Sequence, residues 1–208
     1  MSSLGSGYST VYDEDMAAHP QPRLSPEQYL ELERAAPFRS EYYDGHMYAM
    51  SGSSYAHVLI SRNLSFALHG VIGRRCEVLT NDLRLRISPK GLYTYPDIVV
   101  VCGEPKFADD QKDTLLNPAL IIEILSPSTE AHDRGFKAAQ YRTIESLQEH
   151  ALVSQTEPRV ELFRRHSGGD WLFSESTGIE STCRFASVDC AVALADIYNK
   201  VALESPAA

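Results

Sequence analysis

Hydrophobic and polar residues follow two periods along the chain, which predict helices mixed with strands. Apolar residues recur at helical spacing from 54 to about 72, and His57 falls on the same face. Two segments, TYPDIVVVC at 94–102 and ALIIEIL at 119–125, are apolar along most of their length. Such runs are typical of strands that are buried on both faces. The alternating segment CEVLTNDLRLRI at 76–87 predicts another strand.

Capping and turn residues define the remaining elements. Ser25-Pro26-Glu27-Gln28 begins a helix that we expect to run to about Ala35. Asp44-Gly45 predicts the turn of a hairpin within 40–52. Later segments predict a helix at about 130–144, strands at 149–155, 159–166 and 171–175, and a short helix closing 187–198.

These elements indicate an α/β domain with a mixed sheet flanked by helices. The strand at 119–125, the helix after it and the strand at 149–155 form one crossover unit. We expect a single domain over 23–203, preceded by a loose tail at 1–22 that is polar and acidic.

Two carboxylates interrupt the apolar strands, Asp97 in YPDIVVV and Glu123 in LIIEIL. An isolated charge is costly in such a strand. One interpretation is that ion pairs, with arginines such as Arg84, or the water at a strand end satisfy both groups. The other is that the two carboxylates share a divalent metal ion, which neutralises charge that the protein alone cannot.

A lysine follows the second carboxylate closely. Asp133, Lys137 and Tyr141 are spaced i, i+4, i+8 and share one helix face. Lys137 could therefore reach the site of Glu123, where a metal and a lysine together would suit phosphodiester hydrolysis. The alternative is a surface pair of Asp133 with Lys137, and we interpret Tyr141 as packing.

Three further residues are weaker candidates for the same site. Glu41 could supply an additional acidic ligand, or be a solvated strand residue. His57 could be a hydrogen-bond or metal partner at the edge of the site, or a satisfied core histidine. Asp82 could lie near Asp97 on a neighbouring strand.

Composition limits the possible functions. The chain has 208 residues, a formal net charge of −9 and a sequence pI near 5.2. This acidity argues against a protein dedicated to coating nucleic acid, although it does not exclude an enzyme that acts on one. We expect a cytoplasmic protein with no membrane partner, because no apolar run is long enough to cross a bilayer. We also expect free thiols at Cys76, Cys102, Cys183 and Cys190, as in a reducing compartment.

Several motifs, in order, resemble those of the Uma2 family (domain of unknown function DUF820). These are EYYDGHMYAMSG, AHVLISRNL, YPDIVVV, NPALIIEILSPSTEAHDRGFKAAQYR and SLQEHALVSQ. The resemblance covers about 24–201, and the family is one of restriction-endonuclease-like proteins in the PD-(D/E)XK nuclease superfamily. It implies a restriction-endonuclease-like core in which Asp97, Glu123 and the backbone carbonyl of Ile124 hold the metal. The third place of (D/E)XK is here Leu125, so the resemblance points to Lys137 as the displaced lysine.

The resulting hypothesis is an endodeoxyribonuclease, a hydrolase that uses Mg²⁺ or Mn²⁺ and has Asp97, Glu123 and Lys137 as catalytic residues. The basic residues Arg84, Arg86 and Arg134 would face the phosphates of DNA. A homodimer is expected, since a duplex has two strands and two-fold partners are common. The alternative is a non-catalytic nucleic-acid-binding or interaction module that retains the nuclease core.

Overall fold

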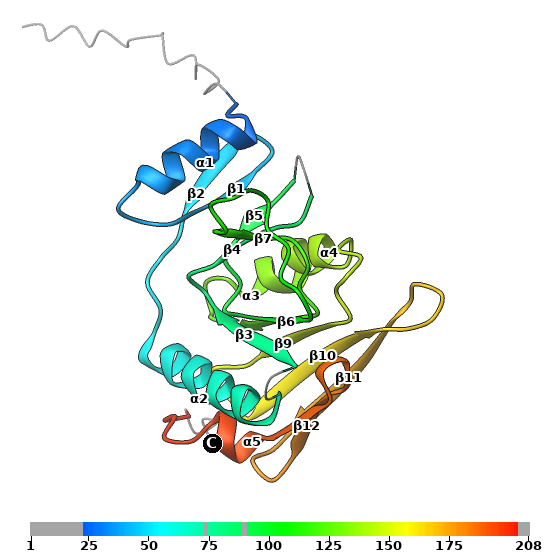
Figure 1. The fold of residues 1–208 in the computed structure, drawn as a ribbon. Helices are drawn as coiled ribbons and strands as arrows, with labels where there is room; N and C mark the ends of the chain where they lie inside the picture. Colours follow the sequence, from blue (N-terminus) through cyan, green and yellow to red (C-terminus); the bar gives the residue numbers. More distant parts are fainter. Residues whose placement is uncertain (1–22, 73–74, 89–90, 204–208) are drawn as a thin grey trace, which may run out of the picture.

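A six-stranded mixed sheet forms the centre of the protein (Figure 1). The structure, a computed structural model, describes residues 23–72, 75–88 and 91–203, so the tail predicted at 1–22 lies outside the described residues. The strand order is β11-β10-β9-β8-β6-β3, and of these pairs only β8 and β9 run parallel. The strands are β3 (Cys76–Thr80), β6 (Ile98–Cys102), β8 (Leu120–Ile124), β9 (Glu149–Val153), β10 (Arg159–Arg165) and β11 (Trp171–Thr177).

One face of this sheet packs on helix α2 (Tyr55–Ile72). The apolar stripe of α2 and the even-numbered side chains of β6 and β8 share one buried core. Because strand side chains alternate between faces, the odd-numbered ones point to the opposite side. A hairpin and a short helix complete the α2 side of the sheet. The hairpin consists of β12 (Thr182–Phe185) and β13 (Cys190–Ala193), which are joined by the 3₁₀ turn η2 (Ala186–Val188), and the helix is α5 (Leu194–Ile197).

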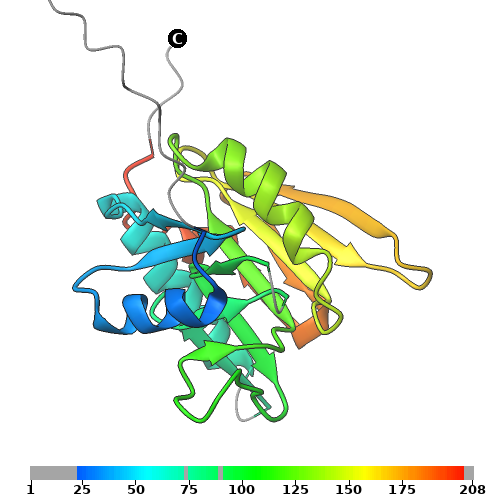
Figure 2. The ribbon, with the colours of Figure 1, turned by 90° about the horizontal axis from the view of Figure 1, so that it is seen from above.

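The opposite face is covered by a helical segment and a second sheet (Figure 2). The helical segment comprises α3 (Glu130–His132), η1 (Asp133–Lys137) and α4 (Ala138–Tyr141). The second sheet has the order β2-β1-β5-β4-β7 and carries α1 (Pro26–Ala35). Its strands are β1 (Ser40–Tyr43), β2 (His46–Ala49), β4 (Arg84–Arg86), β5 (Tyr93–Thr94) and β7 (Thr114–Leu115).

This architecture confirms the predicted α/β class with a mixed sheet flanked by helices. Ser25 caps α1 in a capping box with Gln28, as its sequence indicates. Asp44 and Gly45 both have positive φ, of 45° and 87°, at the turn between β1 and β2. A two-residue turn of this kind matches the twist of its strands, and glycine tolerates it without strain.

Two strands predicted as continuous are each divided between the two sheets. The segment 76–87 turns at 81–83, so β3 belongs to the large sheet and β4 to the small one. The segment 94–102 breaks before Ile98 in the same way, between β5 and β6. Pro96 lies in this break, and a proline has no N–H to give to a strand ladder. Strands β12 and β13 were not predicted.

The helix predicted at 130–144 contains an irregular turn and ends earlier, at Tyr141. Residues 133–137 form a π-helix, in which the N–H of Ala138 donates to the carbonyl of Asp133. Such π segments inside helices are rare and are frequent at functional sites.

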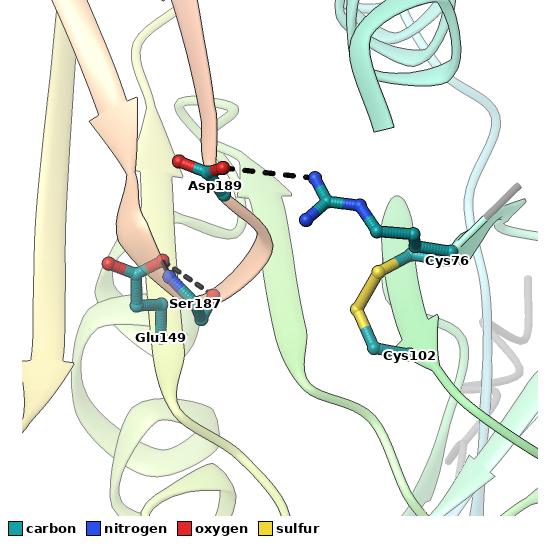
Figure 3. Close-up of a disulfide and its surroundings, with 6 residues drawn as sticks. Cys76, Cys102, Glu149, Ser187 and Asp189 are labelled. Carbon is teal, nitrogen blue, oxygen red and sulfur yellow. Dashed lines mark hydrogen bonds and ion pairs between the residues drawn. A yellow bond between two sulfur atoms is a disulfide. The ribbon is translucent and has the colours of Figure 1, made fainter. Parts of the chain in front are cut away.

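The prediction of free thiols is wrong for two of the four cysteines. Cys76 and Cys102 form a disulfide (Figure 3). They are register partners on neighbouring antiparallel strands, β3 and β6, which brings their side chains together on one face. Cys183 and Cys190 are free and buried, as expected.

The described residues include no helix that is both long and apolar enough to cross a membrane.

Candidate active site

The main cavity of the described residues is a pocket of about 390 Å³ between the two sheets. Each layer of the fold contributes to its wall. The acidic and basic residues in that wall are Glu41 from β1, His57 from α2, Asp97 before β6, Glu123 from β8, His132 from α3, and Asp133 and Lys137 from η1. Two loops rich in serine, 51–54 and 126–129, form part of the wall.

Asp97 and Glu123 lie side by side because their strands are antiparallel neighbours. Ile98 pairs with Ile122, which places the two acidic residues at the next position of the ladder. Each carboxylate accepts a hydrogen bond from the backbone of the other strand. Oδ2 of Asp97 is 2.7 Å from the nitrogen of Ile124, and Oε2 of Glu123 is 3.3 Å from the nitrogen of Asp97. The predicted pair of carboxylates is therefore a feature of the structure.

Glu123 is almost fully buried, with 3% of its surface exposed. Burial raises the pKa of its carboxyl, and the negative charges of Asp97 and Asp133 act in the same direction. The ammonium of Lys137 opposes them. The carboxylate form of Glu123 therefore depends on nearby positive charge.

Lys137 reaches this site and contacts three carboxylates. Its Nζ is 2.9 Å from Oε1 of Glu41, 3.4 Å from Oε1 of Glu123 and 3.5 Å from Oδ1 of Asp133. Burial lowers the pKa of Lys137, but these carboxylates outweigh it and raise the pKa above its ordinary value. The lysine is therefore a fixed cation. The surface-pair interpretation is wrong, since Asp133 and Lys137 are both buried.

Glu41 joins the site from the small sheet. In addition to Lys137, it accepts a hydrogen bond from the hydroxyl of Thr94 on β5. The solvated-strand interpretation does not describe it, because its side chain is only 14% exposed.

His57 and Tyr141 complete the contacts of the two central carboxylates. Nε2 of His57 is 3.0 Å from Oδ1 of Asp97, so this buried histidine lies at the edge of the site. The hydroxyl of Tyr141 is 2.5 Å from Oε1 of Glu123. Burial and the charge of Glu123 raise the pKa of Tyr141 well above its ordinary value, so the phenol keeps its proton and donates. The i, i+4, i+8 spacing places Tyr141 on the same helix face as Asp133 and Lys137, but it does not show that its hydroxyl reaches Glu123.

The donor groups of the pocket suit a hard divalent cation. Four carboxylates, those of Glu41, Asp97, Glu123 and Asp133, line the pocket together with one lysine, which leaves excess negative charge. Oxygen ligands of this kind are those that Mg²⁺ and Mn²⁺ prefer. Within the described ranges, no group of three or more His, Cys, Asp or Glu is arranged to hold a metal. An ion bound by Asp97 and Glu123 would thus need the backbone carbonyl of Ile124 and water, as Mg²⁺ commonly does.

Four other predicted residues do not line the pocket. Asp82 is exposed in the turn between β3 and β4, where it pairs with Arg39. Arg84 is only 4% exposed and donates to Tyr95 and Thr114, so it cannot face DNA as predicted. Arg84 forms its ion pair with Asp113. The interpretation in which Arg84 pairs with Asp97 and Glu123 is therefore wrong.

The other two arginines, Arg134 and Arg86, also lie outside the wall of the pocket. Arg134 is engaged by Glu130 and Glu161. Arg86, on β4, is half-buried, and it lies beside Tyr93. The predicted phosphate-facing group is therefore not assembled around the pocket.

Comparison with known proteins gives a consistent set of relatives. The profile of the Uma2 family, described as "Putative restriction endonuclease", matches residues 26–185. The uncharacterized protein slr1290 of Synechocystis sp. is 42% identical over 165 residues, covering 76% of this chain and 84% of that protein. The uncharacterized protein sll1609 of the same organism is 37% identical over 164 residues, covering 78% of this chain and 93% of that protein.

A solved structure has the same fold. The crystal structure of a putative nuclease belonging to DUF820, from Anabaena variabilis, superimposes with a TM-score of 0.69 at 18% sequence identity. The match covers 84% of this chain and 97% of that chain.

Proposed function

The chain belongs to the Uma2 family, and we propose that it is a metal-dependent endonuclease that hydrolyses phosphodiester bonds in DNA. The observation that carries this proposal is the convergence of Asp97, Glu123 and Lys137 in one pocket. The two carboxylates share hydrogen bonds across neighbouring strands, and the ammonium is 3.4 Å from Glu123. Carboxylates that can hold a metal ion, with a cation beside them, suit metal-assisted phosphodiester hydrolysis.

Each residue has a role that follows from its contacts. Asp97 and Glu123, with the carbonyl of Ile124, would hold Mg²⁺ or Mn²⁺, which activates water and stabilises charge on the phosphoryl oxygens. Lys137 remains protonated, so it acts as a point charge beside the reacting phosphate rather than as a base. Glu41 and Asp133 fix its ammonium.

The surroundings of Lys137 also indicate when a phosphate can enter. Among the described residues that line the pocket, Lys137 is the only lysine or arginine, and three carboxylates surround it. A phosphate would meet net negative charge there until a divalent ion neutralises it. Metal would therefore bind before DNA.

The test is cleavage of plasmid DNA with Mn²⁺ and, separately, with EDTA. Asp97→Ala and Glu123→Ala should each lower the cleavage rate by more than about 100-fold, while circular dichroism shows an intact fold. Glu175→Ala, an exposed acidic position on β11 away from the pocket, is the matched control and should cleave normally. Cleavage by either pocket variant, or in EDTA, would contradict the proposal. Metal-dependent DNA binding without cleavage by the wild type would favour a non-catalytic module instead.

A further inference from the structure

Tyr141 contacts both the carboxylate of Glu123 and the buried core. It is fully buried on α4, and its ring meets the ring of His150 edge-on, with centroids 5.2 Å apart. Its hydroxyl leaves this aromatic contact and points to Oε1 of Glu123, at 2.5 Å. The ring therefore packs in the core, while the hydroxyl donates to a carboxylate that lines the pocket.

The two oxygens of Glu123 have different partners. Oε1 accepts from Tyr141 and lies 3.4 Å from the ammonium of Lys137, whereas Oε2 accepts from the backbone nitrogen of Asp97. The bond from the phenol is the shortest of the three. A glutamate has three side-chain torsions, and this short bond restricts the orientation of the carboxylate at their end.

We propose that Tyr141 is a positioning residue, which holds the carboxylate of Glu123 beside Asp97 in the orientation that binds the divalent metal. This inference rests on the proposed function, because it assigns Glu123 as a metal ligand. Hydrogen bonds from residues behind a ligand orient it and commonly change metal affinity by about 10- to 100-fold.

Packing alone predicts a different outcome from positioning. A phenylalanine fills the same space as a tyrosine and keeps the contact with His150. If Tyr141 only packs, its replacement by phenylalanine leaves metal binding unchanged. If it positions Glu123, the loss of a single hydroxyl weakens metal binding in a protein that remains folded.

The first measurement is Mn²⁺ binding to the full-length, metal-free protein by isothermal titration calorimetry. Tyr141→Phe should raise the Kd for Mn²⁺ by at least about 10-fold relative to the wild type. Tyr198→Phe is the matched control. Tyr198 is also buried, and its hydroxyl bonds to the backbone of Ser154 at 2.8 Å and of Arg159 at 3.0 and 3.1 Å, so the control loses at least as much buried hydrogen bonding away from the pocket. Equal affinities for the wild type and Tyr141→Phe would overturn the inference and leave the proposed function intact.

The second measurement does not depend on metal. Crystal structures of the metal-free wild type, Tyr141→Phe and Tyr198→Phe should show the carboxylate of Glu123 displaced or in several conformers in Tyr141→Phe alone. An unmoved carboxylate in that variant would overturn the inference. A wild type that binds no Mn²⁺ would overturn the proposed function, and the position of Glu123 in the crystals would still decide whether Tyr141 orients it.

Discussion

At the scale of single residues, Lys137 determines the charge balance of the pocket. Its ammonium is buried among three carboxylates, and each pair is close enough to be an ion pair. Removing one partner from a buried ion pair is costly, because it leaves charge that neither water nor a counter-charge compensates. The same lysine that we assign to chemistry is thus required for stability.

We expect Lys137→Met to lower the free energy of unfolding by roughly 3 kcal/mol at pH 7. The loss should become smaller as the pH falls, because protonation of the carboxylates removes the uncompensated charge. Urea unfolding at several pH values measures both effects. Lys106→Met, at an exposed position, is the control and should change stability by less than about 0.5 kcal/mol. A loss at pH 7 no larger than that of the control would contradict the expectation.

His150 is a second buried group whose charge matters. It is fully buried on β9, and neither ring nitrogen has a hydrogen-bond partner within the described part of the chain. Burial lowers its pKa to about 3, and the charges of Arg142 and Lys137 act in the same direction. The unfolded chain, with a histidine pKa near 6.5, binds the proton first as the pH falls.

Stability should therefore decrease on acidification from about pH 6.5 toward the folded pKa, by about 2 kcal/mol between pH 6.5 and pH 5. His150→Phe should remove this part of the pH dependence, since no proton is then taken up on unfolding. His69→Phe, at an exposed position on α2, provides the comparison. An unchanged slope of unfolding free energy against pH in His150→Phe would show that His150 is not its source.

The site residues could be identified from sequence only as far as charge and spacing allow. Asp97 and Glu123 are conspicuous because a carboxylate is unexpected in an apolar strand. The partner of Arg84 could not be inferred, because a buried arginine and a surface arginine look alike in a list of residues. Tyr141 was assigned to packing, since the pattern records its burial and not the direction of its hydroxyl.

At the scale of elements, the sequence correctly predicted the features that depend only on residues close together in the chain. The cap at Ser25 and the turn at Asp44-Gly45 act over a few residues, and both are confirmed. The break before Ile98 is different, because which sheet a strand joins depends on partners distant in sequence. The π-helix at 133–137 likewise depends on tertiary contacts, which keep Asp133 and Lys137 buried.

At the scale of the whole molecule, the disulfide links the edge strand β3 to β6, the strand that follows Asp97. Its two cysteines are 26 residues apart in sequence. A cross-link that closes a loop of this size restricts the unfolded chain and stabilises the fold by about 3 to 4 kcal/mol.

A reducing agent should therefore lower the free energy of unfolding of the wild type by about that amount. Cys76→Ser should already be less stable and should not respond to the reductant. Cys183→Ser, which removes a free thiol, should still respond. Thermal unfolding with and without the reductant makes the comparison, and a wild type that does not respond would contradict it.

The position of the pocket between the two sheets has a consequence for how the protein is made. Its wall draws on residues as far apart in sequence as Glu41 and Gln155, and Ser54 donates to Gln155 across 101 positions. Contacts of such long range form late, because the closure of large loops must precede them. A chain still on the ribosome therefore lacks the complete pocket until β9 and the loop after it have emerged. The catalytic machinery that we propose cannot be assembled before most of the domain has been synthesised.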